Sequence, residues 1–504
     1  MSQRADVCLI IEGGYPYVLG GVSHWTDALI KSMPEMRFHI VALTVSTQKR
    51  ILKYRLPENL VGLTEVLIDK GPQGSIFAPT TDGRLRDVLI ALRSVVTNTN
   101  GEQFADLVRG LSECRLGARH LLDSRAAWKV MEEAYRAEVP NAPLIDFFWA
   151  WRFLCRSVLA VCDAEIPEAS IYHALSTGYA GLYGARASLL RHRPMILTEH
   201  GIYTNERRID ISVADWIFES KGYGFGIRGR GAEMRDLWGA AFSGFSRIAY
   251  QQADFIVSQH SPNQKLQIID GAAHEKSIII PNGIATERFL NIKRNPAPRR
   301  PRVLLIGRVV PIKDIRTFII AISILRQLIP DVEALVMGPE DEDPDYAVGC
   351  RRLVSELQLE ETIKFLGLIR DVSSYFDKVD VIALTSLSEG QPLVLLEAGA
   401  AGIPAVVTDV GCCREIIEGG PTETEPKPGG IVVPACDPHS TAAALARILG
   451  EPDLCCSMGS ALRERVILNY DENKSRASHV RLYDCAVQLD KRNGAPREVT
   501  SWQA

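Results

Sequence analysis

The sequence predicts an α/β protein made of two facing, doubly wound, Rossmann-like domains, the first of which carries helical insertions. Its 504 residues exceed what one hydrophobic core usually serves, which is about 100–200 residues. Short apolar runs rich in Val and Ile alternate along the chain with segments of helical period, and such alternation indicates parallel sheets with right-handed crossovers. A Pro-rich basic segment, residues 291–301, separates two series of these runs.

The runs in both series are interpreted as buried strands, because they are short, apolar and bounded by polar or turn residues. The first series comprises residues 6–11, 38–44, 171–175, 195–198, 254–258 and 277–280. The second series comprises residues 302–306, 333–337, 362–366, 379–384, 405–408 and 431–433.

The segment 291–301 shows no periodicity and is therefore interpreted as an inter-domain linker. We expect an N-terminal domain over residues 1–290, with long helical insertions at about 80–165 and a polar, Gly-rich loop at about 205–235. The C-terminal domain is expected over residues 302–469. Residues 470–504 are expected to form a helix that crosses back over both domains, followed by a frayed tail.

Composition excludes several classes of protein. The net charge of −4 and the pI of about 6.3 argue against a nucleic-acid-binding protein, whose surface is usually basic. No apolar run reaches the length of a membrane span or of a signal peptide, so we expect a cytoplasmic protein that is held at the inner membrane only through partners. The eleven cysteines form no CxxC pair, so we expect small buried thiols in a reducing compartment rather than zinc ligands.

Two motifs of the first domain follow predicted strands, at the edge where doubly wound sheets bind ligands. Gly20 and Gly21 precede a helix predicted from about Ser23, so the backbone can approach a phosphate or a sugar there. His200, in the string TEHG, can orient a hydroxyl or accept a proton. A tight strand–helix turn and a structural histidine are the respective alternatives.

The first strand of the second domain ends in the string IGRVVPIKD. This string places Arg308 and Lys313 at the carboxyl edge of the sheet. Two cations there suit a diphosphate, because Arg binds oxygens through its planar fork and Lys acts as a point charge. A solvated basic loop is the alternative.

The most specific string is SEGQPLVLLE, which follows the predicted strand 379–384. Glu389 lies in the loop and Glu397 nearly two turns into the next helix, so the two carboxylates can hold different parts of one extended ligand. Gly390 permits close backbone approach, and Pro392 suits the first helical turn. Free N–H groups over residues 391–394 would then face a phosphate or a sugar hydroxyl. For either Glu alone, an exposed acid near a helix start is the alternative.

Two further strings resemble motifs but lack the required context. Residues 224–229 match the dinucleotide pattern GxGxxG, yet no strand precedes them, so we interpret the segment as a loop rather than as an NAD site. Residues 341–343, Asp-Glu-Asp, resemble a metal-binding DxD motif but lie in an acidic, Pro-containing loop. We therefore expect no metal site.

Taken together, these residues resemble the retaining glycosyltransferases of family 4, which have the GT-B fold. The second half follows that family's order of motifs, with IGRVVPIKD, VMGPED, FLGLIRDV, SLSEGQPLVLLEAGAAGIPAVVTDVG and GGIVV, and Pro281-Asn282-Gly283 matches its hinge region. The first half is similar to the branch that builds the Pel exopolysaccharide, through ADVCLIIEGGYPYVLGGVSHW and TEHGIYTNERRIDI. In that branch the enzyme works in the bacterial cytosol with an inner-membrane polymer-export complex.

The resemblance implies a role for each candidate residue. Arg308 and Lys313 would bind the donor diphosphate, and Glu389 would hold hydroxyls of the donor sugar. Glu397 would bind the ribose, and His200 would hydrogen-bond the donor sugar near the reaction centre. The other contacts would come from Gly20 and Gly21 to the phosphate or acceptor side, from Leu368, Ile369 and Arg370 to the base, from Gly390, Gln391, Pro392, Leu393 and Val394 to the sugar and β-phosphate, and from Asn282 of the hinge motif to the donor.

The reaction implied by this resemblance moves a hexose from a nucleotide sugar, UDP-glucose or another UDP-hexose, to a growing glycan with retention at the anomeric carbon. Cations and a helix N-terminus would stabilise the leaving diphosphate, so neither a metal nor another cofactor is required. Two alternatives stay open. One is a sugar-nucleotide epimerase on the same fold, and the other is a non-catalytic nucleotide-sugar-binding subunit of a polysaccharide complex.

Overall fold

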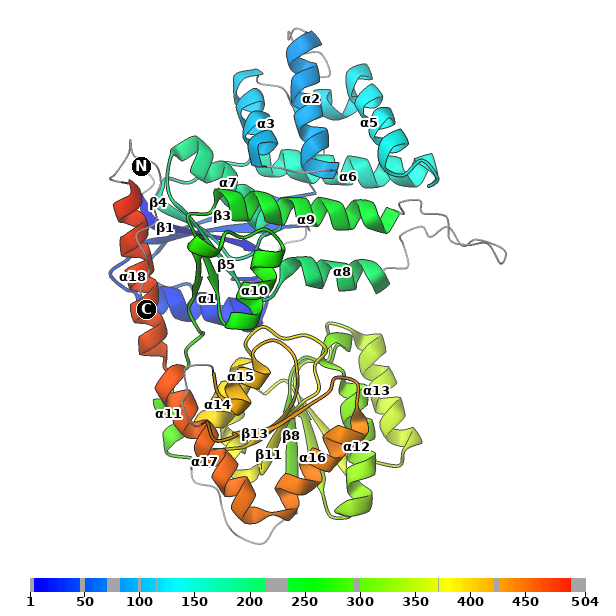
Figure 1. The fold of residues 1–504 in the computed structure, drawn as a ribbon, viewed down its shortest axis with the longest axis vertical. Helices are drawn as coiled ribbons and strands as arrows, with labels where there is room; N and C mark the ends of the chain where they lie inside the picture. Colours follow the sequence, from blue (N-terminus) through cyan, green and yellow to red (C-terminus); the bar gives the residue numbers. More distant parts are fainter. Residues whose placement is uncertain are drawn as a thin grey trace. The chain divides into compact units, whose positions relative to one another are not determined.

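The computed structural model describes residues 4–45, 50–69, 82–97, 101–114, 117–213, 234–292, 300–369, 371–420 and 426–490. These residues fall into two units, each built on its own parallel sheet (Figure 1). Unit 1 takes its residues from 1–258, 264–279 and 479–504, and unit 2 from 259–263 and 280–478. Both units are doubly wound and Rossmann-like, as the alternation of apolar runs and helical segments predicts.

Unit 1 contains a seven-stranded sheet in the order β3-β2-β1-β4-β5-β6-β7. All neighbouring strands are parallel, and Ile10 of β1 lies opposite Val41 of β2 and Ala174 of β4. The strand order reverses between β1 and β4, which makes this position the topological switch point of the sheet. The strands are β1 (Ala5–Glu12), β2 (Phe38–Thr44), β3 (Leu60–Leu67), β4 (Ala169–Ala174), β5 (Met195–Glu199), β6 (Phe255–Ser258) and β7 (Ser277–Ile279).

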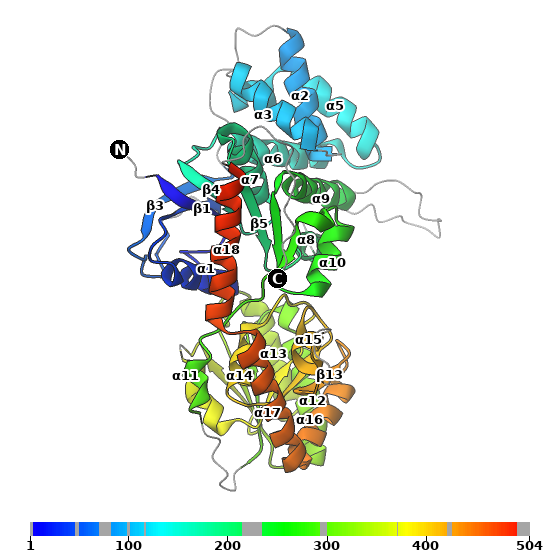
Figure 2. The same cartoon turned by 60° about the vertical axis from the view of Figure 1, so that its left-hand side comes forward.

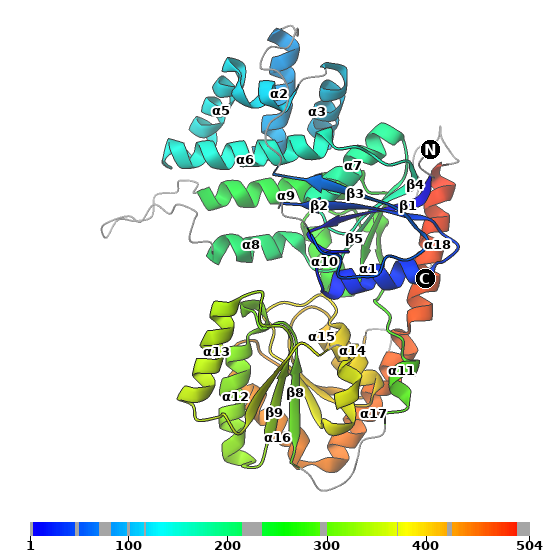
Figure 3. The same cartoon turned by 180° about the vertical axis from the view of Figure 1, so that it is seen from behind.

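Among the described residues, five helices are inserted between β3 and β4 of unit 1, where the sequence predicts an insertion at about 80–165. Three of them, α2, α3 and α5, lie on one side of α6 (Figures 1 and 3). Phe104 and Leu154 of the insertion belong to the same hydrophobic cluster as Ile10 of the sheet, so the insertion shares one core with the domain. The five helices are α2 (Asp82–Thr97), α3 (Gly101–Cys114), α4 (Ala118–Asp123), α5 (Arg125–Glu138) and α6 (Leu144–Asp163).

The remaining helices of unit 1 connect its strands. They are α1 (Gly21–Ser32), α7 (Tyr179–Arg191), α8 (Tyr203–Val213), α9 (Met234–Gln252) and α10 (Ser261–Ile269). The first three residues of α10 are grouped with unit 2. The last helix, α18 (Glu472–Asp490; Figure 2), supplies residues from His479 onward to unit 1. There the hydroxyl of Tyr483 lies 2.9 Å from Nδ1 of His173 on β4.

Unit 2 contains a six-stranded parallel sheet in the order β10-β9-β8-β11-β12-β13, with its switch point between β8 and β11. One hydrophobic cluster includes Phe318 and Leu445, and a second includes Leu396 and Ile416. Val303 and Leu304, neighbours on β8, belong to different clusters, because successive side chains of a strand point to opposite faces. Its strands are β8 (Arg302–Ile306), β9 (Glu333–Met337), β10 (Ile363–Gly367), β11 (Val381–Leu384), β12 (Ala405–Thr408) and β13 (Gly430–Val433), and its helices are α11 (Glu287–Leu290), α12 (Ile315–Leu328), α13 (Pro344–Glu356), α14 (Leu393–Ala400), α15 (Cys413–Glu418), α16 (Pro438–Gly450) and α17 (Pro452–Asn469).

The structure differs from the sequence-based prediction at several boundaries. Strand β3 was not predicted, because it is a half-exposed edge strand whose apolar residues are interrupted by Gly62 and Glu65. The main segment of unit 2 begins at residue 280 rather than after 290. Helix α8 occupies the start of the stretch predicted as a loop at 205–235, and α1 begins at Gly21 rather than near Ser23. Most of the predicted linker, the GxGxxG string and Arg370 lie outside the described residues.

Two features bear on the expected environment of the chain. Within the described ranges, no helix combines the length and the apolar character that crossing a bilayer requires. All eleven cysteines are free thiols; seven of them are buried, whereas Cys436 and Cys456 are exposed.

Candidate functional site

The candidate residues of unit 2 lie in loops on either side of its switch point. Arg308 and Lys313 follow β8, and Glu389 follows β11. Loops on either side of such a point run to opposite faces of the sheet and leave a crevice at its carboxyl edge. The sequence-predicted cations and the first predicted carboxylate are therefore placed where ligands of doubly wound sheets bind.

Lys313 and Glu389 form an ion pair in this crevice. The Nζ atom of Lys313 lies 2.5 Å from Oε1 of Glu389, and the two side chains are 20% and 10% exposed. The hydroxyl of Ser386 donates to the same carboxylate oxygen at 2.6 Å. Charge-assisted hydrogen bonds of this kind are stronger than neutral ones, so the pair holds both side chains in place at the edge of the sheet.

The backbone that carries Lys313 is also held from the β11 side. Lys313 ends a short 3-10 helix, η2 (Pro311–Lys313). The hydroxyl of Thr385 donates to the carbonyl of Lys313 at 3.1 Å, and the amide of Leu387 donates to the carbonyl of Ile312 at 2.8 Å. The loops after β8 and β11 are thus bonded to each other through both backbone and side chains.

Glycines bring neighbouring strand ends together at this edge. The amide of Gly307 donates to the carbonyl of Met337, and the amide of Gly338 donates to that of Gly367, each at 2.9 Å. Gly338 has a φ of +156°, and a Cβ there would lie 1.9 Å from the carbonyl oxygen of Gly307. Only glycine fits this contact, so the loops after β8 and β9 approach each other at backbone distance.

The loop after β12 contacts the backbone of Glu389 and Gly390, which is called the Glu389 turn below. The amide of Cys412 donates to the carbonyl of Gly390 at 3.1 Å. Gly411 has a φ of +55°, and a Cβ at this position would lie 2.2 Å from the carbonyl oxygen of Glu389. The loop after β12 therefore packs against Glu389 and Gly390, which were predicted to hold a sugar.

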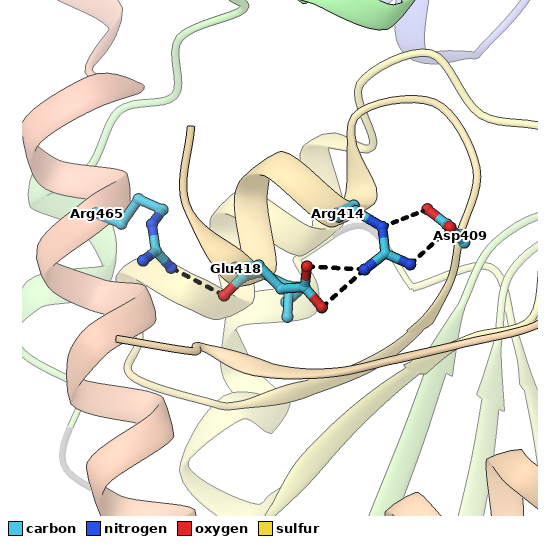
Figure 4. A network of polar contacts seen from close by, with 5 residues as sticks. Asp409, Arg414, Glu418 and Arg465 are labelled. Carbon is cyan, nitrogen blue, oxygen red and sulfur yellow. Dashed lines mark hydrogen bonds and ion pairs between the residues drawn. The ribbon is translucent and has the colours of Figure 1, made fainter. Parts of the chain in front are cut away.

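Helix α15, which follows this loop, is held by two arginines (Figure 4). Arg414 bonds both carboxylate oxygens of Asp409, at 2.7 and 3.0 Å, and also reaches Glu418. The guanidinium of Arg465 is buried and donates to the carbonyls of Ile416 and Ile417. Both arginines thus order the segment that supports the Glu389 turn.

Two further residues contact the Glu389 turn. The amide of Asn282, in the predicted hinge motif, donates to the side-chain oxygen of Gln391 at 2.6 Å. His260 was not identified from the sequence; burial lowers its pKa to about 4, an effect that the backbone of Gly390 partly offsets. The signal was the string SQHSPN directly after the predicted strand 254–258, because residues after buried strands lie at the ligand-binding edge.

Glu397 lies on α14, close to the end of the loop predicted to meet the base. Helix α14 begins at Leu393, with Pro392 as its N-cap, so Glu397 lies just over one turn into the helix rather than nearly two. Burial raises the pKa of Glu397 to about 7, with Arg288 lowering it and Asp371 raising it. A half-buried carboxyl group that titrates near neutrality is typical of functional sites.

The predicted N–H groups over residues 391–394 need a correction. Proline has no N–H group, and the amide of Leu395 donates to the carbonyl of Pro392 at 3.0 Å. The amides of Leu393 and Val394 are therefore the ones that the first turn of α14 presents, since the first amides of a helix have no partner within it.

Arg308 forms a separate ion pair with another partner. Its guanidinium forms two bonds to the carboxylate of Glu342, at 2.5 and 2.7 Å, and both side chains are about half exposed. Glu342 belongs to the Asp-Glu-Asp string, whose last member, Asp343, caps α13 by accepting from the amide of Tyr346. Among the residues that the structure describes, no group of three or more His, Cys, Asp or Glu side chains is arranged to hold a metal ion.

The candidate residues of unit 1 lie at the carboxyl edge of its own sheet. Gly20 precedes α1, and a Cβ built on Gly20 or Gly21 would meet no atom within 4 Å, so open space surrounds this turn. The ring of His200 lies 4.4 Å from that of Trp25 in an edge-on arrangement. Burial, with a smaller effect of His479, lowers the pKa of His200 to about 3, so this imidazole is neutral near pH 7.

Comparison with known sequences assigns families to both halves. Residues 5–275 match a domain of unknown function, DUF3492, and residues 300–451 match the glycosyl transferases group 1 family. D-inositol 3-phosphate glycosyltransferase of Pseudarthrobacter chlorophenolicus is 26% identical over 255 residues, which cover 48% of this chain and 58% of that protein. Phosphatidyl-myo-inositol mannosyltransferase of Mycolicibacterium smegmatis is 29% identical over 238 residues, which cover 45% of this chain and 58% of that protein. The match therefore spans little more than half the length of these relatives.

Solved structures show the same fold. HepE of Anabaena in complex with UDP and glucose superposes with a TM-score of 0.58 at 14% identity, over 95% of this chain and 100% of that one. Sucrose-phosphate synthase from Thermosynechococcus elongatus gives a TM-score of 0.56 at 18% identity, over 95% of this chain and 98% of that one. The two Rossmann-like units are therefore those of the GT-B architecture. Because the first match covers more than half of the 504 residues, the chain belongs to the DUF3492 family, and its second unit carries a glycosyl transferases group 1 domain.

Proposed function

We propose that this protein is a retaining glycosyltransferase that transfers a hexose from a UDP-sugar to a growing exopolysaccharide. The observation that carries the proposal is the pairing of Lys313 with Glu389 at the switch point of a glycosyl transferases group 1 domain. A cation suits a diphosphate, and a carboxylate beside it accepts hydrogen bonds from sugar hydroxyls. The pair can therefore hold both halves of a nucleotide sugar.

In the proposed reaction, the bond between the anomeric carbon and the β-phosphate oxygen breaks, and its electron pair leaves with UDP. An acceptor hydroxyl attacks the carbon from the face that the phosphate leaves, and its proton passes to the departing phosphate oxygen. Attack from that face retains the configuration. Lys313, Arg308 and the first amides of α14 stabilise the negative charge on the diphosphate, which is why EDTA is expected to leave the rate unchanged.

The other candidate residues complete the donor site in this proposal. Glu397 accepts hydrogen bonds from the ribose, and the loop that begins at Leu368 and Ile369 meets the base through its backbone. His200 hydrogen-bonds the donor sugar, and its low pKa keeps the imidazole neutral, so it adds no charge that would compete with the developing positive charge on the sugar.

The resemblance of the first half to the Pel exopolysaccharide glycosyltransferase PelF supports Pel as the product. It also supports a cytosolic enzyme that works with an inner-membrane polymer-export complex. The HepE structure was solved with UDP and glucose, which makes UDP-glucose the first donor to test.

The experiment is a calorimetric titration of the full-length protein in EDTA with UDP-, GDP- and ADP-glucose and with UDP-N-acetylhexosamines. Selective binding of one UDP-sugar that is lost in Lys313→Ala is the expected result. A nucleotide-release assay with a glycan acceptor then separates transfer from epimerisation and from simple binding. If none of the donors binds, or if donor binds without acceptor-dependent release of UDP, the proposed activity is wrong.

A further inference from the structure

Unit 1 contains a cavity of about 570 Å³ that shares no residue with the proposed donor site. It lies at the carboxyl edge of the sheet, where Glu12 ends β1, Val45 follows β2 and Tyr203 begins α8. The rest of its wall comes from the inserted helix α6, from α8 and α9, and from Tyr179 at the start of α7. The volume falls within the range of about 300–1,000 Å³ that is usual for small-molecule sites.

The polar end of the cavity is at the switch point between β1 and β4. One carboxylate oxygen of Glu12 accepts from the amide of Tyr179, the first residue of the helix after β4, at 3.0 Å. The other accepts from the hydroxyl of Tyr203 at 3.1 Å. Arg207 lies over the ring of Tyr203 and pairs with Asp210 at 3.2 Å. Ligands of open α/β sheets bind at this position of the topology, and here it is lined by a fixed polar network.

The apolar wall is made of aromatic rings from two helices. Phe153 of α6 lies 5.7 Å from Trp238 of α9, and Trp238 is stacked on Phe242 with 6.0 Å between the ring centroids. Trp149 of α6 also lines the cavity and remains 61% exposed. Trp149 is thus available to a ligand, whereas Trp238 and Phe242 are buried.

The charges that line the cavity restrict its ligand. Three carboxylates, Glu12, Asp146 and Asp210, face it together with one cation, Arg207, which already pairs with Asp210. An anionic headgroup or a phosphate would be repelled by this lining. Carboxylates accept hydrogen bonds from hydroxyls, and flat aromatic faces pack against apolar C–H surfaces. A ligand with hydroxyls at its edges and C–H groups on its faces would match both the carboxylates and the aromatic rings.

We infer that this cavity binds a neutral oligosaccharide, with a pyranose ring packed on Trp149 and its hydroxyls bonded by Asp146 and Asp210. The description of that oligosaccharide as the growing acceptor rests on the proposed function. The inserted helix α6 supplies Asp146, Trp149 and Phe153, so the insertion gives this domain a glycan site that its sheet alone could not form.

The test is calorimetry on the full-length protein with maltohexaose, cellohexaose and chitohexaose, and with farnesyl phosphate as an anionic lipid probe. Trp149→Ala is compared with Trp128→Ala. Trp128 is 49% exposed on α5 of the same insertion but lies outside the cavity, so it is a matched control for loss of an exposed indole. Asp210→Asn provides a second variant that keeps the side-chain size.

At least one hexasaccharide is expected to bind, with affinity at least tenfold weaker in Trp149→Ala, weaker in Asp210→Asn and unchanged in Trp128→Ala. UDP-glucose binding should be the same in all four proteins. The inference is overturned if no hexasaccharide binds, if Trp149→Ala binds as the wild type does, or if farnesyl phosphate is the probe whose binding depends on Trp149. A wrong assignment of the donor site would give a different result: the wild type would bind no UDP-sugar, or Lys313→Ala would bind UDP-sugar as tightly as the wild type.

Discussion

The Nζ atom of Lys313 lies 2.5 Å from Oε1 of Glu389, and the two residues come from the loops on either side of the switch point of unit 2. Their side chains are partly withdrawn from water, where an ion pair is screened less than at the surface. Each residue therefore holds the other in place, and removal of either one leaves its partner uncompensated. A diphosphate that binds Lys313 would leave the carboxylate of Glu389 available to a sugar hydroxyl.

Replacement of Lys313 by Ala is expected to weaken UDP-glucose binding by tenfold or more, which corresponds to about 1.4 kcal/mol per factor of ten. The cause is loss of the cation that faces the diphosphate. Lys364→Ala is the matched control, because Lys364 also pairs with a carboxylate, that of Glu333 at 2.9 Å, but near the amino end of the same sheet. Calorimetry on both variants checks this, and equal affinities would remove Lys313 from the donor site.

Donor binding is expected to depend on the ionisation of Glu397. Burial raises the pKa of this carboxyl group to about 7, so it is protonated below that pH and ionised above it. An ionised carboxylate accepts hydrogen bonds from ribose hydroxyls more strongly, and affinity for UDP-glucose should therefore rise as the pH increases from 6 to 8. In Glu397→Gln the affinity should be lower and nearly independent of pH. A slope that persists in this variant would assign the titration to another group, such as Glu199, whose pKa burial also raises to about 7.

Gly411→Ala is expected to disturb the Glu389 turn. The left-handed conformation at this position costs a non-glycine residue about 1–2 kcal/mol, and a Cβ would lie 2.2 Å from the carbonyl oxygen of Glu389. We expect a lower midpoint of thermal unfolding together with weaker UDP-glucose binding. Gly450→Ala, at the end of α16, meets no atom within 4 Å and should change neither quantity appreciably. Normal donor binding in Gly411→Ala would show that this turn does not position Glu389.

Arg465 and Arg414 should differ sharply in their effect on stability (Figure 4). Arg465 is 4% exposed, and Arg465→Met would leave the buried carbonyl of Ile416 without its side-chain donor, whereas the carbonyl of Ile417 would keep the amide of Gly429 at 2.7 Å. We expect a loss of about 2 kcal/mol, since one unpaired buried group costs roughly 1–3 kcal/mol. Arg414→Met removes exposed ion pairs with Asp409 and should cost less than about 1 kcal/mol. Urea denaturation of both variants measures the difference, and similar losses would contradict this account.

Much of the fold follows from local sequence patterns. Buried parallel strands are short apolar runs, which is why β8 and β9 were predicted with the bounds that the structure shows. The order of the strands was not predicted, because it depends on which distant runs pair. Strand β3 was missed for a related reason: an edge strand is covered on fewer sides and needs fewer apolar residues, so its pattern is weaker.

For the candidate site, too, some features could be predicted from the sequence and others could not. The residues at strand ends, Lys313 and Glu389 among them, could be named from the sequence, because a buried run followed by polar residues marks the ligand-binding edge of a parallel sheet. The partner of each side chain could not be named. Arg308 pairs with Glu342, 34 positions away, and the amide of Asn282 donates to the side chain of Gln391, because contacts between separate loops are set by how the strands are ordered and how the loops pack.

By itself, the sequence determined that this chain forms two α/β domains and where along it the ligand-binding loops occur, since both follow from local periodicity and from the residues that end each strand. Only the tertiary structure decided which charges meet, how far Glu397 and His200 are withdrawn from water, and that α6 closes an aromatic cavity over the sheet of unit 1. These properties depend on burial and on distances between residues far apart in the chain, which no local pattern encodes.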